Sequence, residues 1–391
     1  MKILLLIPAL GTVYGGPSKL LPLLAGELGR RGLQIDLVAT NADGAATLDA
    51  PVGRWIEQDG YRLRYFSRLG RAEYKLSFAL AAWLARHVAE YDLAHIHSDF
   101  NFPVLVAASA CRWRKVPYLL TPHGMLEPWA LGYKAWKKRA YYERVERPLV
   151  LRGARALHAL NRSEAANIEA LKLGPPVVVL PNGIDPSEAG AVGPAKAEVF
   201  LERFPALRGK KLILFLHRID PKKGLDILAS AYRQVRERFP QTHLVVAGPD
   251  TTGYTPAARG FFEAAGCADA VTFTGMLEGD AKHGALASAS VFVTPSYSEG
   301  FSMSVLEAMA AGLPCVLTEG CNFPEAGEAG AARILPTGDA DRFARELLDL
   351  LDHPETARTV GARASELVLS RYTWPRVAEE YERMLGRILS A

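Results

Sequence analysis

The 391-residue sequence lacks several features that would place it in a special class of protein. Its four cysteines, at positions 111, 267, 315 and 321, form no C-x-x-C pair, which argues against a disulfide framework and against a cysteine metal site. No low-complexity tract occurs, and the apolar runs fall far short of the roughly 20 residues that a membrane-spanning helix needs. We therefore expect a cytoplasmic globular protein whose cysteines are reduced and packed in the core.

The sequence also lacks the glycine fingerprint of dinucleotide binding. No G-x-G-x-x-G follows a predicted strand with an acidic residue placed for a ribose, so a NAD-dependent oxidoreductase is disfavoured. The segment from Met1 to Pro8 is too short for a signal peptide and runs into a glycine loop and a helical pattern. It predicts a first strand instead.

Charge is distributed unevenly between the two halves of the chain. The net charge is +4, but residues 1–185 hold 24 Lys/Arg against 16 Asp/Glu, whereas residues 186–391 hold 22 against 26. The first half should therefore prefer an anionic partner or surface. We expect no nucleic-acid partner.

Both halves begin with a buried apolar run, a glycine-containing loop, an amphipathic stretch and a second apolar run. Such a strand–helix–strand unit requires a parallel sheet with helices on both faces. The two units comprise Lys2–Ile7, Pro17–Arg31 and Leu33–Ala39, and then Leu212–Leu216, Gly224–Phe239 and His243–Ala247. Later strands are predicted at Leu93–His97, Tyr118–Pro122, Ala156–Leu160, Val271–Thr274, Val291–Thr294, Pro314–Leu317 and Ala332–Leu335.

The length and the repeated pattern predict an α/β protein of two Rossmann-like, doubly wound parallel-sheet domains. The Pro/Gly-rich region Gly174–Gly193 divides them, which gives domains of residues 1–185 and 186–374. Two such domains facing across a cleft would place the carboxyl ends of both sheets at one crevice, where ligands of these folds bind. The terminal helix within residues 375–391 must bury its apolar side, and we expect it to cross back onto the first domain.

Two glutamates, Glu299 and Glu307, flank a turn and a helix in the second half. Glu299-Gly300-Phe301 is predicted as the exit turn of a buried strand, and Ser302–Ala311 as a helix. A helix N-terminus presents unpaired N–H groups that bind phosphate, whereas two carboxylates favour hydroxyl groups. The segment therefore predicts a nucleotide sugar as ligand. The competing interpretation of each glutamate alone is a solvated residue on a helix face.

The loop His217–Gly224 leaves a strand and enters a helix, and it carries Arg218 and Lys223. A guanidinium and an ammonium at this spacing suit the two phosphates of a diphosphate, although a basic surface loop would have the same sequence. Gly248 ends the next strand, and Met276 and Leu277 follow another. A flat base could approach the backbone at these strand ends.

The first half offers two further candidate segments at predicted strand ends. Gly15 and Gly16 open a helix and form a second N-terminus suited to an anion. His123 follows one strand and His97 ends the strand before it, near Asp92 and His95, so a polar acceptor pocket is expected there. The alternative is that the histidines are hydrogen-bonded structural residues.

In this order along the chain, the motifs resemble those of the retaining glycosyltransferases of family 4, which have the GT-B fold. The matching elements are Gly15-Gly16, Pro122-His123-Gly124, Pro181-Asn182-Gly183-Ile184-Asp185, Arg218 with Lys223-Gly224, Pro295-Ser296, Glu299-Gly300-Phe301, Leu306-Glu307-Ala308-Met309-Ala310, Pro324-Glu325 and Gly338-Asp339. The resemblance covers nearly the whole chain. The segment His123–Ala130 is most similar to that of exopolysaccharide and surface-glycan enzymes.

The resemblance implies a role for each matching residue, with the first domain binding the acceptor and the second the donor. Arg218 and Lys223 would hold the donor diphosphate, Glu307 the ribose hydroxyls and Glu299 the donor sugar. His123 would lie near the anomeric carbon. Backbone N–H groups from Gly300, Phe301, Ser302 and Met303 would contact sugar and phosphate. Two departures affect the base and sugar contacts, because the family commonly has glycine at the position of Ser302 and a longer turn at Gly248-Pro249.

The resemblance implies transfer of a hexose from a UDP- or GDP-sugar to a glycan or lipid-linked acceptor. The residue inventory predicts that this transfer needs no metal or other cofactor. Cations and helix N-termini can stabilise the charge that develops on the departing diphosphate. Asp339-Ala340-Asp341 only superficially matches a metal-binding D-x-D, because it precedes a helix and is expected to cap it. Family membership implies retention, and since no carboxylate is clearly placed as a nucleophile we favour attack from the face that the phosphate leaves.

Residues 129–142 mix aromatic and basic side chains in the basic half of the chain. Such a mixture suits the headgroups of an anionic bilayer and would hold the protein peripherally at the inner face of the cytoplasmic membrane. An amphipathic helix that buries its aromatics explains the same pattern. Other GT-B activities stay open, such as a sugar-nucleotide 2-epimerase or a sucrose- or glycogen-synthase-like enzyme, as does a non-catalytic nucleotide-sugar-binding protein.

Overall fold

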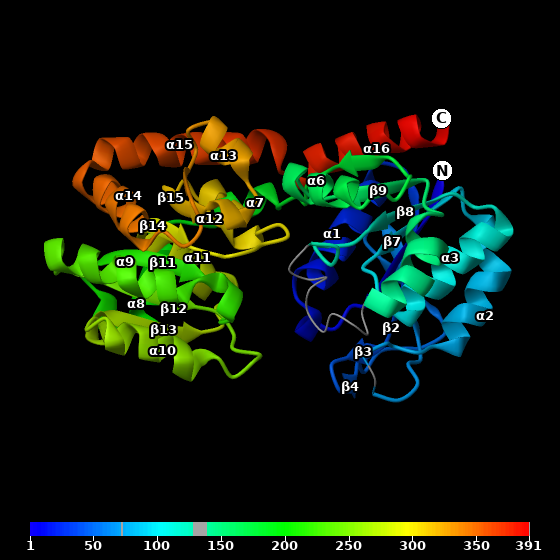
Figure 1. The fold of residues 1–391 in the computed structure, drawn as a ribbon, viewed down its shortest axis with the longest axis horizontal. Helices are drawn as coiled ribbons and strands as arrows, with labels where there is room; N and C mark the ends of the chain where they lie inside the picture. The colour runs from blue at the N-terminus through cyan, green and yellow to red at the C-terminus, as the bar shows by residue number, and fades with distance from the viewer. Residues whose placement is uncertain (72, 128–138, 391) are drawn as a thin grey trace. The chain divides into compact units, whose positions relative to one another are not determined.

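The computed structural model describes residues 1–71, 73–127 and 139–390 (Figure 1). Contacts within the chain define two compact units, which we call unit 1 (Met1–Gly183 and Trp374–Ala391) and unit 2 (Ile184–Thr373). The boundaries fall one or two residues earlier than the sequence predicted. The reason is that Ile184 and Thr373 form a parallel bridge, with the Ile184 N–H donating to the Tyr372 carbonyl at 2.8 Å, so both belong to unit 2.

Unit 1 is built on an eight-stranded sheet with the order β10-β9-β8-β7-β1-β2-β6-β5. All neighbouring strands are parallel except β5 and β6, which are antiparallel. The strands are β1 (Lys2–Ala9), β2 (Gln34–Thr40), β5 (Trp55–Gln58), β6 (Tyr61–Phe66), β7 (Leu93–His97), β8 (Tyr118–Thr121), β9 (Ala156–Ala159) and β10 (Val177–Val179), with a separate small hairpin of β3 (Ala42–Asp43) and β4 (Ala46–Thr47).

Helices cover both faces of this sheet. The helices are α1 (Gly16–Arg30), α2 (Phe78–His87), α3 (Phe102–Arg114), a π-helix (Tyr142–Leu151), α6 (Arg162–Ala170) and α16 (Trp374–Ser390). Apolar residues of α2, α3, the π-helix and α6 share one core with the sheet, and those of α1 and α16 share the other. The continuous burial of β1 from Ile3 to Ala9 follows from this double cover.

The C-terminal helix α16 packs on unit 1, as the sequence predicted (Figure 1). Its apolar side contributes Val377, Tyr381 and Leu385 to the core that it shares with α1. Its polar side adds an ion pair in which Arg31 lies 2.7 Å from Glu382. The helix therefore buries its apolar face in the core of unit 1, although the whole of unit 2 lies between it and the rest of unit 1 in the sequence.

Unit 2 contains a six-stranded parallel sheet with the order β13-β12-β11-β14-β15-β16. The strands are β11 (Lys211–Leu216), β12 (Thr242–Ala247), β13 (Val271–Gly275), β14 (Ala289–Thr294), β15 (Cys315–Thr318) and β16 (Arg333–Leu335). Helices α9 (Leu225–Arg238), α10 (Thr255–Ala264) and α14 (Ala340–Asp352) share one core, and α8 (Pro194–Arg203), α11 (Gly279–Ser288), α12 (Met303–Ala310), α13 (Pro324–Glu328) and α15 (Pro354–Arg371) share the other. Short helix α7 spans Pro186–Gly190.

Two smaller predictions are confirmed by this fold. Asp339 caps α14, because its carboxylate accepts a hydrogen bond from the Arg342 N–H at 2.8 Å. The four cysteines are unpaired and buried. The doubly wound architecture of each unit is also as predicted.

Candidate functional site

In unit 2, the loops that follow β11 and β14 bring Lys223 and Glu299 together as an ion pair. Both side chains are buried, with 6% and 8% of their surface exposed. The Ser296 hydroxyl donates to the same carboxylate oxygen, Oε1, at 2.7 Å. The other oxygen of Glu299 carries neither of these two contacts and is the one that a ligand hydroxyl could use.

Gly224 is the residue that lets the two loops approach. Its φ of +69° is in the left-handed region, and a Cβ atom there would lie 2.1 Å from the carbonyl oxygen of Pro295. The contact is extended by a hydrogen bond from the Tyr297 N–H to the Lys222 carbonyl at 2.8 Å. The backbone at Gly224 thus packs against the backbone at Pro295, and this close approach brings Lys223 within reach of Glu299.

We expect Gly224→Ala to lower the free energy of unfolding by about 2–4 kcal/mol, because left-handed strain and overlap with the Pro295 carbonyl add. Gly209→Ala is the matched control: the φ of Gly209 is also positive, at +72°, but no atom of the described residues lies within 4 Å of an added Cβ. It should cost about 1 kcal/mol. Urea denaturation of both variants measures the difference, and equal losses would show that the two loops are not held in close contact.

The charge of Glu299 is set by two opposing effects. Burial alone would raise the pKa of its carboxyl, but the charge of Lys223 and the hydrogen bonds from Lys223 and Ser296 act together against burial, and the pKa falls to about 2. The glutamate is therefore ionised at every physiological pH. An ionised carboxylate held by a lysine is suited to accept hydrogen bonds from sugar hydroxyls and unsuited to contact phosphate directly.

His217 is part of the same cluster, and the sequence reasoning did not single it out. Its imidazole lies 2.9 Å from the Thr294 hydroxyl, 3.1 Å from the Ser304 hydroxyl and 3.9 Å from Glu299 Oε1. Burial and the nearby Lys223 lower its pKa to about 3, so it is neutral. The ring thus ties the ends of β11 and β14 to the first turn of α12. The sequence did hold a signal for His217, because this residue stands next to Arg218 in a loop at the end of a strand.

Helix α12 begins where the sequence predicted, with Ser302 as its N-cap. The Ser302 hydroxyl accepts from the Val305 N–H at 3.4 Å, and its φ of −88° requires no glycine. The serine that departs from the family pattern is therefore a conventional helix cap. Phe301 packs near Phe323 and Tyr372, with ring centroids 6.3 Å away in each case, which anchors the turn that precedes the helix.

Arg218 and Glu307, the other two charged residues predicted for the donor site, lie outside the Lys223–Glu299 ion pair. Arg218 is exposed at the end of β11. Glu307 forms an ion pair with Lys282 at 3.1 Å, and Lys282 also lies 2.9 Å from Glu188. Burial raises the pKa of Glu307 although Lys282 opposes it. The sequence analysis missed Lys282, which determines how the Glu307 carboxylate is held.

The strand ends expected to meet a base are also placed by the structure. A Cβ atom on Gly248 would lie 1.7 Å from the His217 carbonyl, so close packing of neighbouring strand ends already requires glycine there. Met276 is 47% exposed, whereas the Leu277 side chain is buried in the core. The Leu277 side chain is therefore not open to a ligand.

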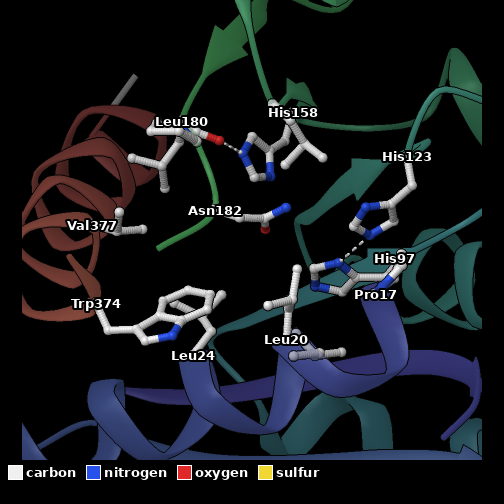
Figure 2. A pocket seen from close by; sticks show the side chains of 13 residues that line it. Pro17, Leu20, Leu24, His97, His123, His158, Leu180, Asn182, Trp374 and Val377 are labelled. Carbon is white, nitrogen blue, oxygen red and sulfur yellow. Dashed lines mark hydrogen bonds between the residues drawn. The ribbon is translucent and has the colours of Figure 1, made fainter. Parts of the chain in front are cut away.

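In unit 1, His97 and His123 form a hydrogen-bonded pair (Figure 2). The Nδ1 atom of His97 lies 3.0 Å from the Nε2 atom of His123. His123 has a left-handed φ of +54° and is followed by Gly124 with a φ of +76°. Gly15, with a φ of +79°, precedes the first residue of α1, Gly16, and supplies no side-chain cap. The N-terminus of α1 is thus left without a side-chain acceptor from its N-cap residue.

His95, which we expected to help form a polar pocket, is instead a structural residue. It is fully buried, and both ring nitrogens have partners at 2.7 Å, the hydroxyls of Tyr381 and Thr121. Thr121 also lies 2.7 Å from His158, whose Nε2 atom is 2.7 Å from the Leu180 carbonyl. This chain of hydrogen bonds joins α16, three strands and the segment before Pro181. Asp92 similarly accepts from the Lys2 N–H at 2.7 Å.

Glu164 holds the loop that carries His123, and sequence reasoning missed it. One carboxylate oxygen accepts from the Gly124 N–H at 2.7 Å and the other from the Leu160 N–H at 2.8 Å. Asn161 caps α6 by accepting from the Glu164 N–H at 2.8 Å. The spacing of Asn161 and Glu164 matches a capping box, which was a readable signal. In the structure, however, Glu164 binds two backbone groups outside its own helix.

Burial raises the pKa of Glu164 to about 7, although the two N–H groups oppose the shift. A carboxyl whose pKa is raised in the folded state stabilises most below its unfolded pKa, near 4.5, and this stability is lost as pH rises toward 7. We expect Glu164→Gln to be less stable than wild type at pH 5. Its stability should not fall between pH 5 and pH 8 on account of this side chain, because an amide does not ionise. Thermal unfolding of both proteins at pH 5 and pH 8 measures it; equal pH dependence would contradict the raised pKa.

Residues 1–71, 73–127 and 139–390, the described part of the chain, contain neither a metal-binding cluster nor a membrane-spanning helix. No cluster of three or more His, Cys, Asp or Glu side chains is arranged to hold a metal ion. Within the same residues, no helix combines the length and the apolar character needed to cross a bilayer. Residues 129–138, the main part of the expected membrane-binding stretch, lie outside the described residues.

Comparison with known proteins places the chain in a family. The family model described as "Glycosyl transferases group 1" matches residues 199–367, and that described as "Glycosyltransferase Family 4" matches residues 14–188. A phosphatidyl-myo-inositol mannosyltransferase of Mycolicibacterium smegmatis is 29% identical over 313 residues, or 79% of this chain and 74% of its own. A GDP-mannose:cellobiosyl-diphosphopolyprenol alpha-mannosyltransferase of Komagataeibacter xylinus is 28% identical over 80% of this chain and 75% of its own.

Solved structures agree on the fold. Sucrose-phosphate synthase of Thermosynechococcus elongatus superposes with a TM-score of 0.79 at 21% identity, covering 100% of this chain and 99% of its own. The Anabaena protein HepE, in complex with UDP and glucose, gives a TM-score of 0.77 at 20% identity over 99% of this chain and 100% of its own. The fold is therefore GT-B, as predicted. Since the two family models together match most of the sequence, the chain belongs to glycosyltransferase family 4.

Proposed function

We propose that this protein transfers a hexose from a nucleoside diphosphate sugar to a glycan or lipid-linked acceptor, with retention of configuration and without a metal. The observation that carries the proposal is the buried Lys223–Glu299 pair beside the N-terminus of α12. It combines, at one sheet edge, a cation and a helix N-terminus for phosphate with a carboxylate for sugar hydroxyls. The mannosyltransferase relatives support the same reaction class and make GDP-mannose the first donor to test.

In this proposal the residues of unit 2 divide the donor between them. Lys223, Arg218 and the backbone at Gly300–Met303 stabilise the negative charge that develops on the diphosphate as the glycosidic bond breaks. Glu299 orients the donor sugar through the oxygen that Lys223 and Ser296 leave available. Glu307 receives the ribose hydroxyls while Lys282 fixes its carboxylate. Backbone at Gly248, Met276 and Leu277 contacts the base.

Unit 1 supplies the acceptor side of the reaction. His123 is the catalytic residue nearest the anomeric carbon. His97 contacts the acceptor and is hydrogen-bonded to the His123 ring. Gly15 and Gly16 direct the N-terminus of α1 toward donor phosphate. Glu299 is held by Lys223 and is not proposed as a nucleophile, so the departing phosphate oxygen accepts the acceptor's proton on the same face of the sugar.

A hydrolysis and transfer screen tests the function. UDP-glucose, UDP-galactose, UDP-N-acetylglucosamine and GDP-mannose are incubated with the protein in EDTA, and released nucleotide is measured. One donor should be consumed well above the others, and proton NMR of the transferred sugar should show the anomeric configuration of the donor. Binding without turnover of any donor or acceptor would indicate a nucleotide-sugar sensor, and activity only with added metal would overturn the metal-free part.

Peripheral attachment to an anionic membrane is the remaining part of the proposal. Its support is the excess of Lys/Arg over Asp/Glu in residues 1–185, together with the aromatic and basic sequence at 129–142. Such attachment weakens as salt screens the charges. Flotation with phosphatidylglycerol vesicles at low and high salt tests it, and a protein that stays in the bottom fraction at low salt would contradict it.

A further inference from the structure

Helix α6 holds the turn that follows His123 through two side chains, Glu164 and Asn167, which we call the α6 clamp. The two residues are three apart and therefore lie on the same face of the helix. The Glu164 carboxylate accepts a hydrogen bond from the Gly124 N–H at 2.7 Å. The Asn167 side-chain amide donates to the Glu127 carboxylate. The clamp thus contacts both ends of the turn.

The backbone of this turn is strained and only weakly bonded to itself. His123 has a φ of +54° and Gly124 a φ of +76°, so two consecutive residues are left-handed, which is unfavourable for a histidine. Within the turn, the Met125 N–H lies 3.2 Å from the Pro122 carbonyl, and the Glu127 N–H lies 3.3 Å from the Gly124 carbonyl. A strained conformation persists only where its surroundings impose it. The clamp supplies that constraint from outside the turn.

The Glu164 side chain is itself rigidly placed. It is only 1% exposed, and its second carboxylate oxygen accepts from the Leu160 N–H at 2.8 Å. Its own N–H donates at 2.8 Å to Asn161, which caps α6. Because Leu160 directly follows β9, the carboxylate joins the end of a central strand and the start of a helix to the loop after β8. A group held by regular elements positions a loop more precisely than another loop could.

Stability alone does not account for this arrangement. It buries two carboxyl groups at one turn, since Glu127 is 8% exposed and Glu164 1%. Burial raises the pKa of both, and the charge of Glu127 adds to the rise for Glu164. Glu127 Oε1 is also buried without a hydrogen-bond partner among the residues that the structure describes. Apolar side chains of similar shape would avoid these costs, so the arrangement indicates that the position of the turn matters in itself.

We propose that Glu164 and Asn167 are positioning residues, which hold His123 in the place that sugar transfer requires. Their hydrogen bonds end on the turn after His123, whereas the ring of His123 is bonded to His97 at 3.0 Å (Figure 2). The clamp therefore fixes the backbone from which the imidazole projects without using either ring nitrogen. The catalytic part played by His123 rests on the proposed function, whereas the mechanical link between the clamp and His123 does not.

A double-mutant cycle on the full-length protein tests the proposal. Glu164→Gln keeps an acceptor for one backbone N–H group but turns its own NH₂ group toward the other. We expect it to lower kcat about tenfold or more and to change KM for the sugar nucleotide less than about twofold. In a His123→Ala background the same substitution should change the remaining kcat less than about twofold, because no ring is left to position. Glu169→Gln, at an exposed position of α6, is the matched control and should leave kcat unchanged.

A second measurement needs no turnover. In protein labelled with ¹⁵N-histidine, Glu164→Gln and Asn167→Ala should each shift the imidazole signals of His123 in long-range ¹H–¹⁵N NMR, whereas those of the exposed His353 in unit 2 should stay in place. Unmoved His123 signals, or an equal fall in kcat with and without the His123 ring, would overturn the proposal. A protein that shows the shifts but transfers no sugar contradicts the proposed function alone. An active enzyme whose kcat is unchanged by Glu164→Gln contradicts only this inference.

Discussion

Lys223→Met should reduce turnover of the preferred sugar nucleotide at least a hundredfold and lower the free energy of unfolding by about 3–5 kcal/mol. The two losses have separate causes. Turnover falls because the diphosphate loses a preorganised cation, while stability falls because Glu299 stays buried without its partner. The stability loss should shrink as pH falls toward the unfolded pKa of Glu299, since the unpaired carboxyl can then be neutral.

A double variant separates the two effects of this substitution. Lys223→Met with Glu299→Gln removes both charges, so it should recover most of the lost stability but none of the activity. Glu198→Ala is the control, because Glu198 forms an exposed ion pair with Arg208 in the same unit and its loss should leave the urea midpoint unchanged. If the double variant were as unstable as the single one, the buried charge would not be the cause.

The sequence was sufficient for the elements whose patterns are local. Lys211–Leu216 and Thr242–Ala247 are apolar runs bounded by turn residues and separated by an amphipathic helix, so their parallel pairing could be predicted. β5 and β6 were missed, because Trp55–Gln58 and Tyr61–Phe66 are half-buried and mix aromatic with charged residues. These two segments become strands because β6 pairs with β2 at the edge of the sheet and β5 then pairs with β6.

The candidate site was predictable in its residue types but not in its contacts. Lys223 and Glu299 were each identified from a strand-end loop, yet their pairing depends on the approach of Gly224 to Pro295, which no local pattern encodes. The same limit applies to Glu307, whose partner Lys282 lies on a different helix. Glu164 carried a recognisable capping spacing, but its bond to Gly124 spans forty residues.

Arg218→Ala should lower turnover about a hundredfold while leaving stability unchanged. The guanidinium is exposed at the end of β11, so its removal leaves no buried partner. Its proposed role is confined to the charge that develops on the diphosphate, and loss of one such donor typically costs about 3 kcal/mol of transition-state stabilisation. The fall should therefore appear in kcat, with a smaller change in KM for the sugar nucleotide.

Arg208→Ala is the matched control for this prediction, because Arg208 is also an exposed arginine of unit 2 and lies away from the strand-end loops. Steady-state kinetics and urea denaturation of both variants give the comparison. Arg218→Lys should recover part of the activity, since lysine keeps the charge but loses the planar donor fork. Turnover that is equally high in both alanine variants would remove Arg218 from the diphosphate site. Lys223 and the N-terminus of α12 would then be left to bind the donor, because the buried ion pair to Glu299 does not depend on Arg218.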